Sequence, residues 1–184
     1  ATKVGWWKRE GLSSDRIRAA FDESLARLGR DHVDLYYFHV PDPSTPIEES
    51  LTAIGTLVVS GRIAHFGISN YASWQALELL HAAQRLGLPR PAVSQQLYNL
   101  LMRQLDLEYF RFAAKYALHT TVYNPLAGGL LARTSDEIAA APARGSRFDR
   151  SFMAIAAAAD GLGVALESTR LAERELASGR LVAP

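Results

Sequence analysis

The sequence contains no cysteine, and this absence excludes disulfide bonds, thiol catalysis and metal sites built on cysteine. No apolar run approaches the roughly 20 residues that a membrane-spanning helix needs, and no segment has the composition of a signal peptide. The formal net charge of +1 gives no overall field that would attract nucleic acid or an acidic membrane surface. We therefore expect a cytoplasmic protein that binds neither nucleic acid nor a membrane.

The chain does contain an apolar segment followed by an amphipathic one, repeated with a period of about 30 residues. The apolar segments are typical of strands and begin near residues 2, 33, 64, 92 and 120. Because parallel strands need crossover connections of this length, the sequence predicts an α/β fold, a partial (β/α) barrel of the TIM type with about five βα units. An open, doubly wound sheet is the competing interpretation.

Capping signals mark the ends of the expected helices. Ser13 or Ser14 is a candidate N-cap for a helix that runs to Leu28, and Gly29 suits the left-handed position after it. Thr45, Pro46 and Glu48 form the pattern of an N-cap, a first-position proline and a capping-box acid. We expect further helices over residues 73–86 and 106–118.

Polar residues recur where the predicted strands end: His39, Ser69, Asn70, Gln96, Asn99, Tyr123 and Asn124. The carboxyl ends of parallel strands meet at one edge of a sheet, and in (β/α) barrels that edge carries the chemistry. A series of such positions along the whole chain favours the barrel over the doubly wound sheet.

The regular period ends after residue 132. Residues 133–150 are rich in alanine, proline and charge and are predicted to form a linker. Residues 151–184 predict a short α/β tail with a shorter period. We therefore expect three parts: a partial barrel over residues 1–132, the linker, and the tail.

Several ordered motifs in residues 1–132 resemble the aldo-keto reductase family, in the branch with aflatoxin-aldehyde and potassium-channel-subunit-like members. They are ATKVG at the start, Val33-Asp34-Leu35-Tyr36 with His39 and Pro41-Asp42, Phe66-Gly67-Ile68-Ser69-Asn70, Gln95-Gln96-Leu97-Tyr98-Asn99, and Tyr123-Asn124-Pro125-Leu126-Ala127-Gly128-Gly129. The resemblance implies NADP-dependent reduction of a small-molecule carbonyl substrate, with no metal. It identifies Lys3 and His39 as catalytic, Ser69, Asn70 and Gln96 as holding the nicotinamide amide, and Tyr123 as stacking on the nicotinamide ring.

Two departures from the family pattern bear on activity. The family's catalytic tyrosine and aspartate precede the lysine strand, where this chain starts, so we expect a truncated reductase with impaired catalysis. Residues 151–184 resemble the end of the effector domain of a LysR-type regulator. The resemblances together describe a chimeric chain.

Two other function classes stay open. His39, Asp42, His65 and His119 supply the residue types of a metal-assisted or cofactor-independent ester or lactone hydrolase, although their spacing matches no known metal motif. A partial barrel also leaves two strand edges unpaired, which favours homo-oligomers and a non-enzymatic binding module.

Overall fold

A computed structural model describes residues 1–5 and 10–134 of the chain. The predicted tail, and all of the predicted linker beyond residue 134, lie outside the described residues. The chain divides into two compact units, one formed by Ala1–Leu97 with Gln104–Tyr123 and the other by Tyr98–Arg103 with Asn124–Pro184.

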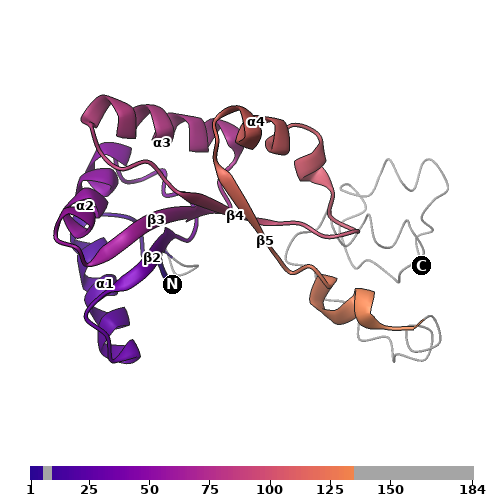
Figure 1. The fold of residues 1–184 in the computed structure, drawn as a ribbon, viewed down its shortest axis with the longest axis horizontal. Coiled ribbons are helices and arrows are strands. Elements are labelled where there is room, and N and C mark those ends of the chain that lie inside the picture. Colours follow the sequence, from indigo (N-terminus) through magenta and orange to yellow (C-terminus); the bar gives the residue numbers. More distant parts are fainter. Residues whose placement is uncertain (6–9, 135–184) are drawn as a thin grey trace. The chain divides into compact units, whose positions relative to one another are not determined.

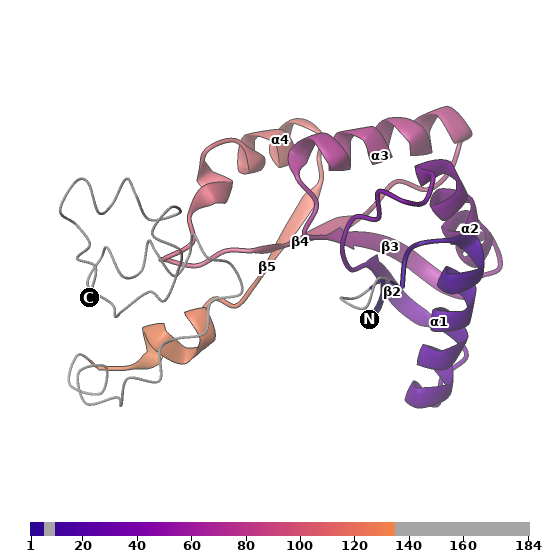
Figure 2. The ribbon, with the colours of Figure 1, turned by 180° about the vertical axis from the view of Figure 1, so that it is seen from behind.

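The first unit is a parallel sheet with helices between successive strands (Figures 1 and 2). Its strands are β1 (Thr2–Val4), β2 (Val33–Phe38), β3 (Ile63–Ser69), β4 (Val93–Leu97) and β5 (His119–Tyr123). Its helices are α1 (Ser14–Leu28), α2 (Ile47–Val59), α3 (Ser73–Leu86), the 3₁₀ turn η1 (Gln104–Asp106) and α4 (Tyr109–Lys115).

The strand order distinguishes the two expected architectures. The strands follow one another as β1-β2-β3-β4-β5, and every neighbouring pair is parallel. Right-handed crossovers in this order place all helices on one side of the sheet, whereas a doubly wound sheet reverses its order at a switch point. Consecutive helices also contact each other, α1 with α2, α2 with α3 and α3 with α4. The arc of a (β/α) barrel is therefore confirmed.

The helix ends agree with the sequence at α1 and differ at α2. Ser13 is the N-cap of α1 and accepts a hydrogen bond from the backbone N–H of Arg16, and Gly29 ends the helix at φ 61°. The capping box expected at the start of α2 is wrong. The helix begins at Ile47 with Pro46 as N-cap and no side-chain cap, because the Thr45 hydroxyl instead donates to Asp42 at 2.6 Å.

The core lies between the sheet and its helices. Tyr36 and Phe38 point toward the helices and are fully buried, and the Tyr36 hydroxyl donates to the carbonyl of Ile17 in α1. The rings of Phe21 and Tyr36 meet edge to face with centroids 4.9 Å apart. Because side chains alternate along a strand, the intervening residues of β2 face the opposite side, where the expected site lies.

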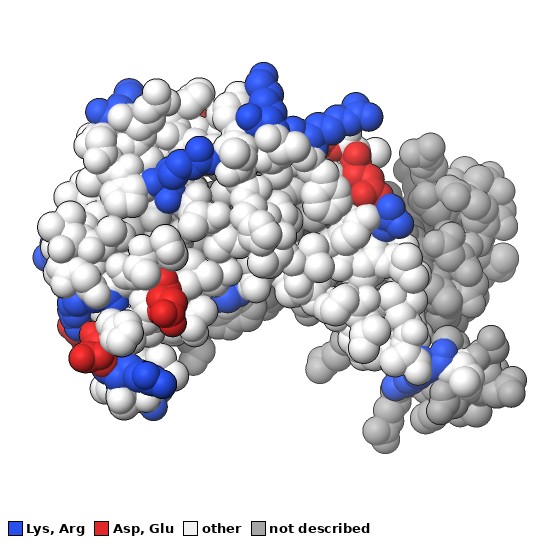
Figure 3. Space-filling model, viewed as in Figure 1, with Lys and Arg blue, Asp and Glu red and all other residues white. Residues whose placement is uncertain are grey.

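Charged side chains on the helices and in the turn before β3 pair with one another. Near α1, basic and acidic side chains lie side by side (Figure 3), and Arg62 bonds Asp22 at 2.6 Å while Arg16 bonds Glu23 at 3.1 Å. These pairs are solvent-exposed and contribute little to the free energy of unfolding, about 0–1 kcal/mol each. None of the helices over residues 1–5 and 10–134 is both long and apolar enough to cross a membrane.

In the second unit, the described residues are 98–103 and 124–134. Asn99 organises them: its side-chain oxygen accepts from the N–H groups of Leu101 and Met102, and its amide donates to the carbonyl of Asn124. The turn η2 (Ala127–Ala132) follows. The buried Asn99 side chain thus holds local loop structure, which accounts for its position after β4.

Candidate functional site

Strand register places one row of side chains on the face away from the helices. Lys3 of β1 pairs with Tyr37 of β2, Tyr37 with Gly67 of β3, and Gly67 with Val93 of β4. Residues paired across neighbouring strands project from the same face. Lys3 and His39, which follows Tyr37 by two positions, therefore share this face near the carboxyl edge.

The Lys3 side chain reaches from β1, the first strand of the sheet, to a residue of β4. Its Nζ donates a hydrogen bond to Oε1 of Gln95 and lies 5.2 Å from the centroid of the Tyr37 ring. Burial lowers the pKa of Lys3 below its ordinary value, because the charged form loses hydration there. A partly buried amine held by two neighbours is suited to influence a reacting proton.

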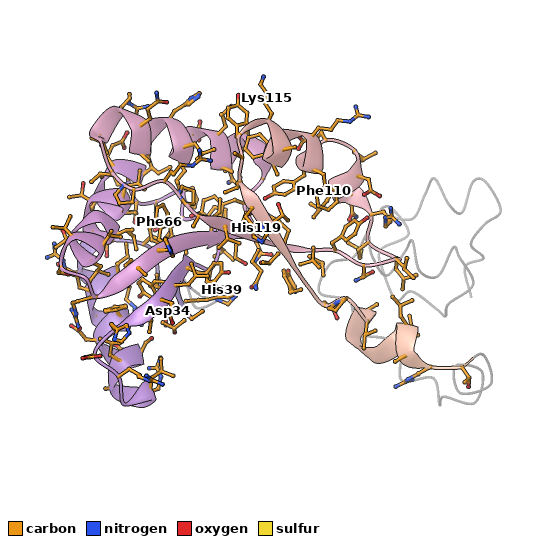
Figure 4. All side chains as sticks on the ribbon, viewed as in Figure 1. Asp34, His39, Phe66, Phe110, Lys115 and His119 are labelled. Carbon is orange, nitrogen blue, oxygen red and sulfur yellow. The ribbon has the colours of Figure 1, made fainter. Side chains whose placement is uncertain are left out.

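His39 lies just beyond the carboxyl end of β2, and Asp34 lies near the strand's other end (Figure 4). Its backbone N–H donates to the carbonyl of Val4 at 2.8 Å, so the chain continues the pairing of β1 and β2 at this point. Burial, and secondly the charge of Lys3, lower the pKa of His39 to about 4. The imidazole is therefore neutral at physiological pH and can donate one N–H to a carbonyl oxygen.

Asn70, Ser69 and Tyr123 form a hydrogen-bond network at the same edge. The Asn70 amide nitrogen donates to the His39 carbonyl and to the Ser69 hydroxyl oxygen, both at 3.1 Å. The Tyr123 hydroxyl donates to the Asn70 side-chain oxygen at 2.8 Å. Ser69 and Asn70 do not cap the next helix, since the N-cap of α3 is Ala72. Of the expected site residues, these three and His39 are brought together.

Asn70 adopts the left-handed backbone conformation, with φ 62°. Asparagine tolerates this region better than most residues other than glycine. Its backbone N–H donates to the Gln95 carbonyl at 3.0 Å, which ties the end of β3 to β4. The backbone conformation therefore aims the Asn70 amide across the edge of the sheet.

The structure differs from the expectation for Gln96. Its side chain is only 6% exposed and donates to the Tyr71 carbonyl and the Ser94 hydroxyl oxygen, both at 2.9 Å. Gln95, one residue earlier, points to the opposite face and accepts from Lys3. Because successive side chains of a strand alternate, only one of the two glutamines can lie beside Lys3.

The sequence analysis gave no role to Gln95 or Thr121, and it considered Asp42 only as a possible metal ligand. Gln95 pairs in register with Thr121, whose buried hydroxyl oxygen has no hydrogen-bond partner among the described residues. Asp42 accepts from the Leu12 N–H at 2.7 Å and from the hydroxyls of Ser44 and Thr45. Burial acts to raise the pKa of Asp42, but these hydrogen bonds outweigh it and lower the pKa to about 2. The alternation of side chains along β4 could have indicated which glutamine faces the site, but only with the pairing of β4 to its neighbouring strands known.

A cavity of about 230 Å³ opens on the helix side of the sheet. Its lining includes Leu12, Phe38, Asp42, Tyr71, Trp74 and Glu78. Phe38 faces the helices, whereas Lys3 and Tyr37 occupy the other face. This cavity is therefore separate from the polar cluster around His39.

The proposed metal ligands do not converge. Within residues 1–5 and 10–134, no three side chains of histidine, aspartate or glutamate lie close enough together to hold a metal ion. His65 is level with Leu35 in the strand register, toward the amino ends of the strands. Nothing in the described part favours the metal-assisted hydrolase.

The chain is similar in sequence to proteins of one known family. The sequence profile of the Aldo/keto reductase family matches residues 1–177. The chain is 42% identical over 131 residues to aflatoxin B1 aldehyde reductase member 2 of Mus musculus, which is 71% of this chain and 36% of the relative. It is 40% identical over 131 residues to aflatoxin B1 aldehyde reductase member 4 of Homo sapiens, 71% of this chain and 40% of the relative.

A protein of Oryza sativa subsp. japonica, described as a probable voltage-gated potassium channel subunit beta, is 35% identical over 136 residues, covering 71% of this chain and 42% of that protein. The chain thus spans less than half the length of these relatives. The expected family is confirmed, and the relatives include both expected kinds of protein, aflatoxin aldehyde reductases and a potassium channel subunit. The family profile continues to residue 177, over most of the segment expected to resemble a LysR-type regulator, and the comparisons give that resemblance no support.

Proposed function

The chain belongs to the Aldo/keto reductase family, and we propose on that basis that its described residues form part of a site for NADP(H)-dependent reduction of small-molecule carbonyl compounds. The observation that carries the proposal is the joining of His39, Asn70 and Tyr123 at one sheet edge. Aldehydes are the proposed substrate class, because two of the relatives are named aldehyde reductases.

The donor set at this edge suits the amide end of a nicotinamide. A carboxamide needs both acceptors and donors, and Asn70, Ser69 and Gln95 offer amide and hydroxyl groups on neighbouring strands. The buried Thr121 hydroxyl beside Gln95 has no partner among the described residues and is a further group that a ligand could satisfy. We propose Gln95 rather than Gln96 for this role.

Tyr123 is proposed as the aromatic surface beside the nicotinamide ring. Its hydroxyl is fixed by Asn70, which restrains the ring's rotation at the end of β5. An aromatic ring at this edge is suited to stack on the flat nicotinamide ring.

When bound, the cofactor supplies the hydride that reduces the carbonyl carbon. His39, neutral above a pKa of about 4, donates a hydrogen bond to the carbonyl oxygen and orients it. Lys3 stabilises negative charge that develops on that oxygen, and its partial burial strengthens this interaction.

The proton donor of the reaction is not evident among the tyrosines on this face. The Tyr123 hydroxyl already donates to Asn70, and Tyr37 presents its ring to Lys3. A general acid contributes about 10²–10⁴-fold to the rate. We therefore propose slow turnover for this chain, together with retained cofactor binding. We also propose a cytoplasmic location and self-association through unpaired strand edges. Light scattering tests the self-association.

The test is NADPH-dependent reduction of 4-nitrobenzaldehyde, followed by the absorbance of NADPH. We expect slow, cofactor-dependent turnover that His39→Ala abolishes and that His81→Ala, a change on the outer helix α3, leaves intact. Turnover that is independent of NADPH, or that His39→Ala does not alter, would contradict the proposal. A chelator-sensitive ester hydrolysis would support the hydrolase instead.

A further inference from the structure

Tyr37 is the second residue of the row that starts at Lys3. It pairs in register with Lys3 on one side and with Gly67 on the other, and it is 5% exposed. The neighbouring residues Tyr36 and Phe38 point into the helix-side core, so Tyr37 is the aromatic residue that β2 turns toward the site.

The Tyr37 ring lies over the position where β3 has no side chain. A Cβ atom added to Gly67 would stand 2.6 Å from Cε1 and 2.7 Å from Cδ1 of the ring. Such distances are far below van der Waals contact, so any larger residue at position 67 would displace the ring. Gly67 has ordinary backbone geometry. The absence of a side chain at this position leaves the space that the Tyr37 ring fills.

With its position fixed in this way, the ring meets the Lys3 ammonium. Nζ lies 5.2 Å from the ring centroid, within the range of a cation–π interaction. The ammonium is partly buried and has lost part of its hydration. Gln95 accepts one of its three N–H groups, and the negative face of the ring compensates for part of the remaining loss.

We propose that Tyr37, held in place by the empty position at Gly67, is a positioning residue that keeps the Lys3 side chain extended over the sheet and its ammonium charged. The proposal rests on the proposed function only in giving Lys3 a role at the site. A charged Lys3 also acts on His39 at the end of β2, because burial and then the charge of Lys3 lower the pKa of His39.

The chain offers an internal comparison on its surface. Lys115 Nζ lies 5.5 Å from the ring centroid of Tyr116, a similar contact at the end of α4, where Lys115 is exposed. Water competes for an exposed ammonium, so the ring contributes less there than at a desolvated site. Removing the Tyr37 ring and the Tyr116 ring in turn therefore shows how much burial adds to the effect of a ring contact on the lysine ammonium.

The experiment is NMR of the full chain with ¹³C at the lysine ε carbons, titrated with pH. The lysines of the chain are Lys3, Lys8 and Lys115, so the spectrum is simple to assign by substitution. We expect Tyr37→Leu to lower the pKa of Lys3 by about half to one unit, as loss of a partly desolvated cation–π contact implies. Tyr37→Phe keeps the aromatic face and retains most of the wild-type value, whereas Gly67→Ala shifts the pKa in the same direction as Tyr37→Leu.

Tyr116→Leu is the matched control and leaves the Lys3 signal unchanged. A Lys3 pKa that is the same in Tyr37→Leu and the wild type, in a folded protein, would overturn the proposal. If Tyr37→Leu does not fold, the wild type still decides: protons on the Lys3 ε carbon must show an upfield ring-current shift, and their absence refutes the contact. Neither readout needs the cofactor, so a failure to bind NADPH leaves this test intact.

Discussion

The hydroxyl of Tyr123 donates a 2.8 Å hydrogen bond to the side-chain oxygen of Asn70, although 53 positions separate the two residues in the sequence. Tyr123 ends β5 and Asn70 follows β3, so the bond passes over the end of the intervening strand β4. It links the ring proposed to face the nicotinamide to the amide proposed to bind it.

Tyr123→Phe removes the hydroxyl and keeps the ring. We expect the free energy of unfolding to fall by about 0.5–1.5 kcal/mol, the usual net value of one hydrogen bond. The NADPH Kd should rise several-fold, because Asn70 loses one of the groups that orient it. Urea unfolding and a fluorescence titration measure the two quantities. An NADPH affinity equal to that of the wild type would show that Tyr123 does not organise the site.

Gln95 and Gln96 are a natural matched pair, because one faces the site and the other the core. Gln96→Met leaves the Tyr71 carbonyl and the Ser94 hydroxyl without their buried donor, and should cost about 1–3 kcal/mol of unfolding free energy. Gln95→Met removes the acceptor of Lys3 and should change stability less, while weakening NADPH binding about tenfold.

Urea unfolding and NADPH titration of both variants check this pair of expectations. The reverse pattern, with cofactor affinity lost in Gln96→Met and kept in Gln95→Met, would show that the assignment of faces is wrong.

The imidazole of His39 should resist protonation. Burial, then the charge of Lys3, lower its pKa from 6.5 to about 4, so the unfolded chain binds this proton more readily than the folded one. The stability that His39 contributes is therefore complete above pH 6.5 and is lost as the pH falls through about 4. NMR titration of the histidine ring protons measures the pKa directly.

The same titration in Lys3→Met separates the two causes. The pKa of His39 should rise only part of the way toward its ordinary value, since burial is the larger cause. A wild-type pKa near 6.5, or complete recovery in Lys3→Met, would contradict the geometry described for this strand end.

Asp42 should give the chain a sensitivity to acid. The hydrogen bonds that lower its pKa to about 2 stabilise the charged form, so their contribution is present above about pH 4 and is lost as the pH falls toward 2. Asp42 is partly exposed, and after allowance for solvent screening we expect about 1 kcal/mol from this source.

Urea unfolding at pH 7 and at pH 3 checks the Asp42 prediction. The difference between the two pH values should shrink in Asp42→Asn. Asp34→Asn is the control, because Asp34 lies exposed on β2 and its substitution should leave that difference in place. An unchanged difference in Asp42→Asn would exclude Asp42 as the acid-sensitive group.

The sequence predicted the fold well because hydrophobic periodicity and glycine positions are local signals. The apolar segment from Val33 to His39 predicted β2, and the glycine after Leu28 predicted the end of α1, from neighbouring residues alone. The capping box at Thr45 failed because the Thr45 hydroxyl donates to Asp42, three residues away, and does not accept from an N–H group of the helix. A capping pattern does not record such a nearby partner of the capping side chain.

The residues of the proposed site could be chosen from the sequence less completely than the elements of the fold. His39, Ser69, Asn70 and Tyr123 could be named because each directly follows or ends a strand. Choosing between Gln95 and Gln96 needed the strand register, since a shift of one residue moves a side chain to the other face. The contacts of Lys3 with Gln95 and Tyr37 join β1 to β4 and to β2, and a single sequence carries no record of such long-range pairs.

We propose above all that the carboxyl edge of this sheet binds a nicotinamide cofactor through Asn70. The most direct measurement is an NADPH titration, followed by energy transfer from tryptophan to the bound cofactor, with wild type, Asn70→Gly and Lys115→Met compared. Glycine keeps the left-handed backbone of position 70 and removes only the amide, so the fold should persist. We predict micromolar-range binding that Asn70→Gly weakens about tenfold and Lys115→Met leaves unchanged; equal affinity in wild type and Asn70→Gly, or no binding by the folded wild type, would contradict the claim.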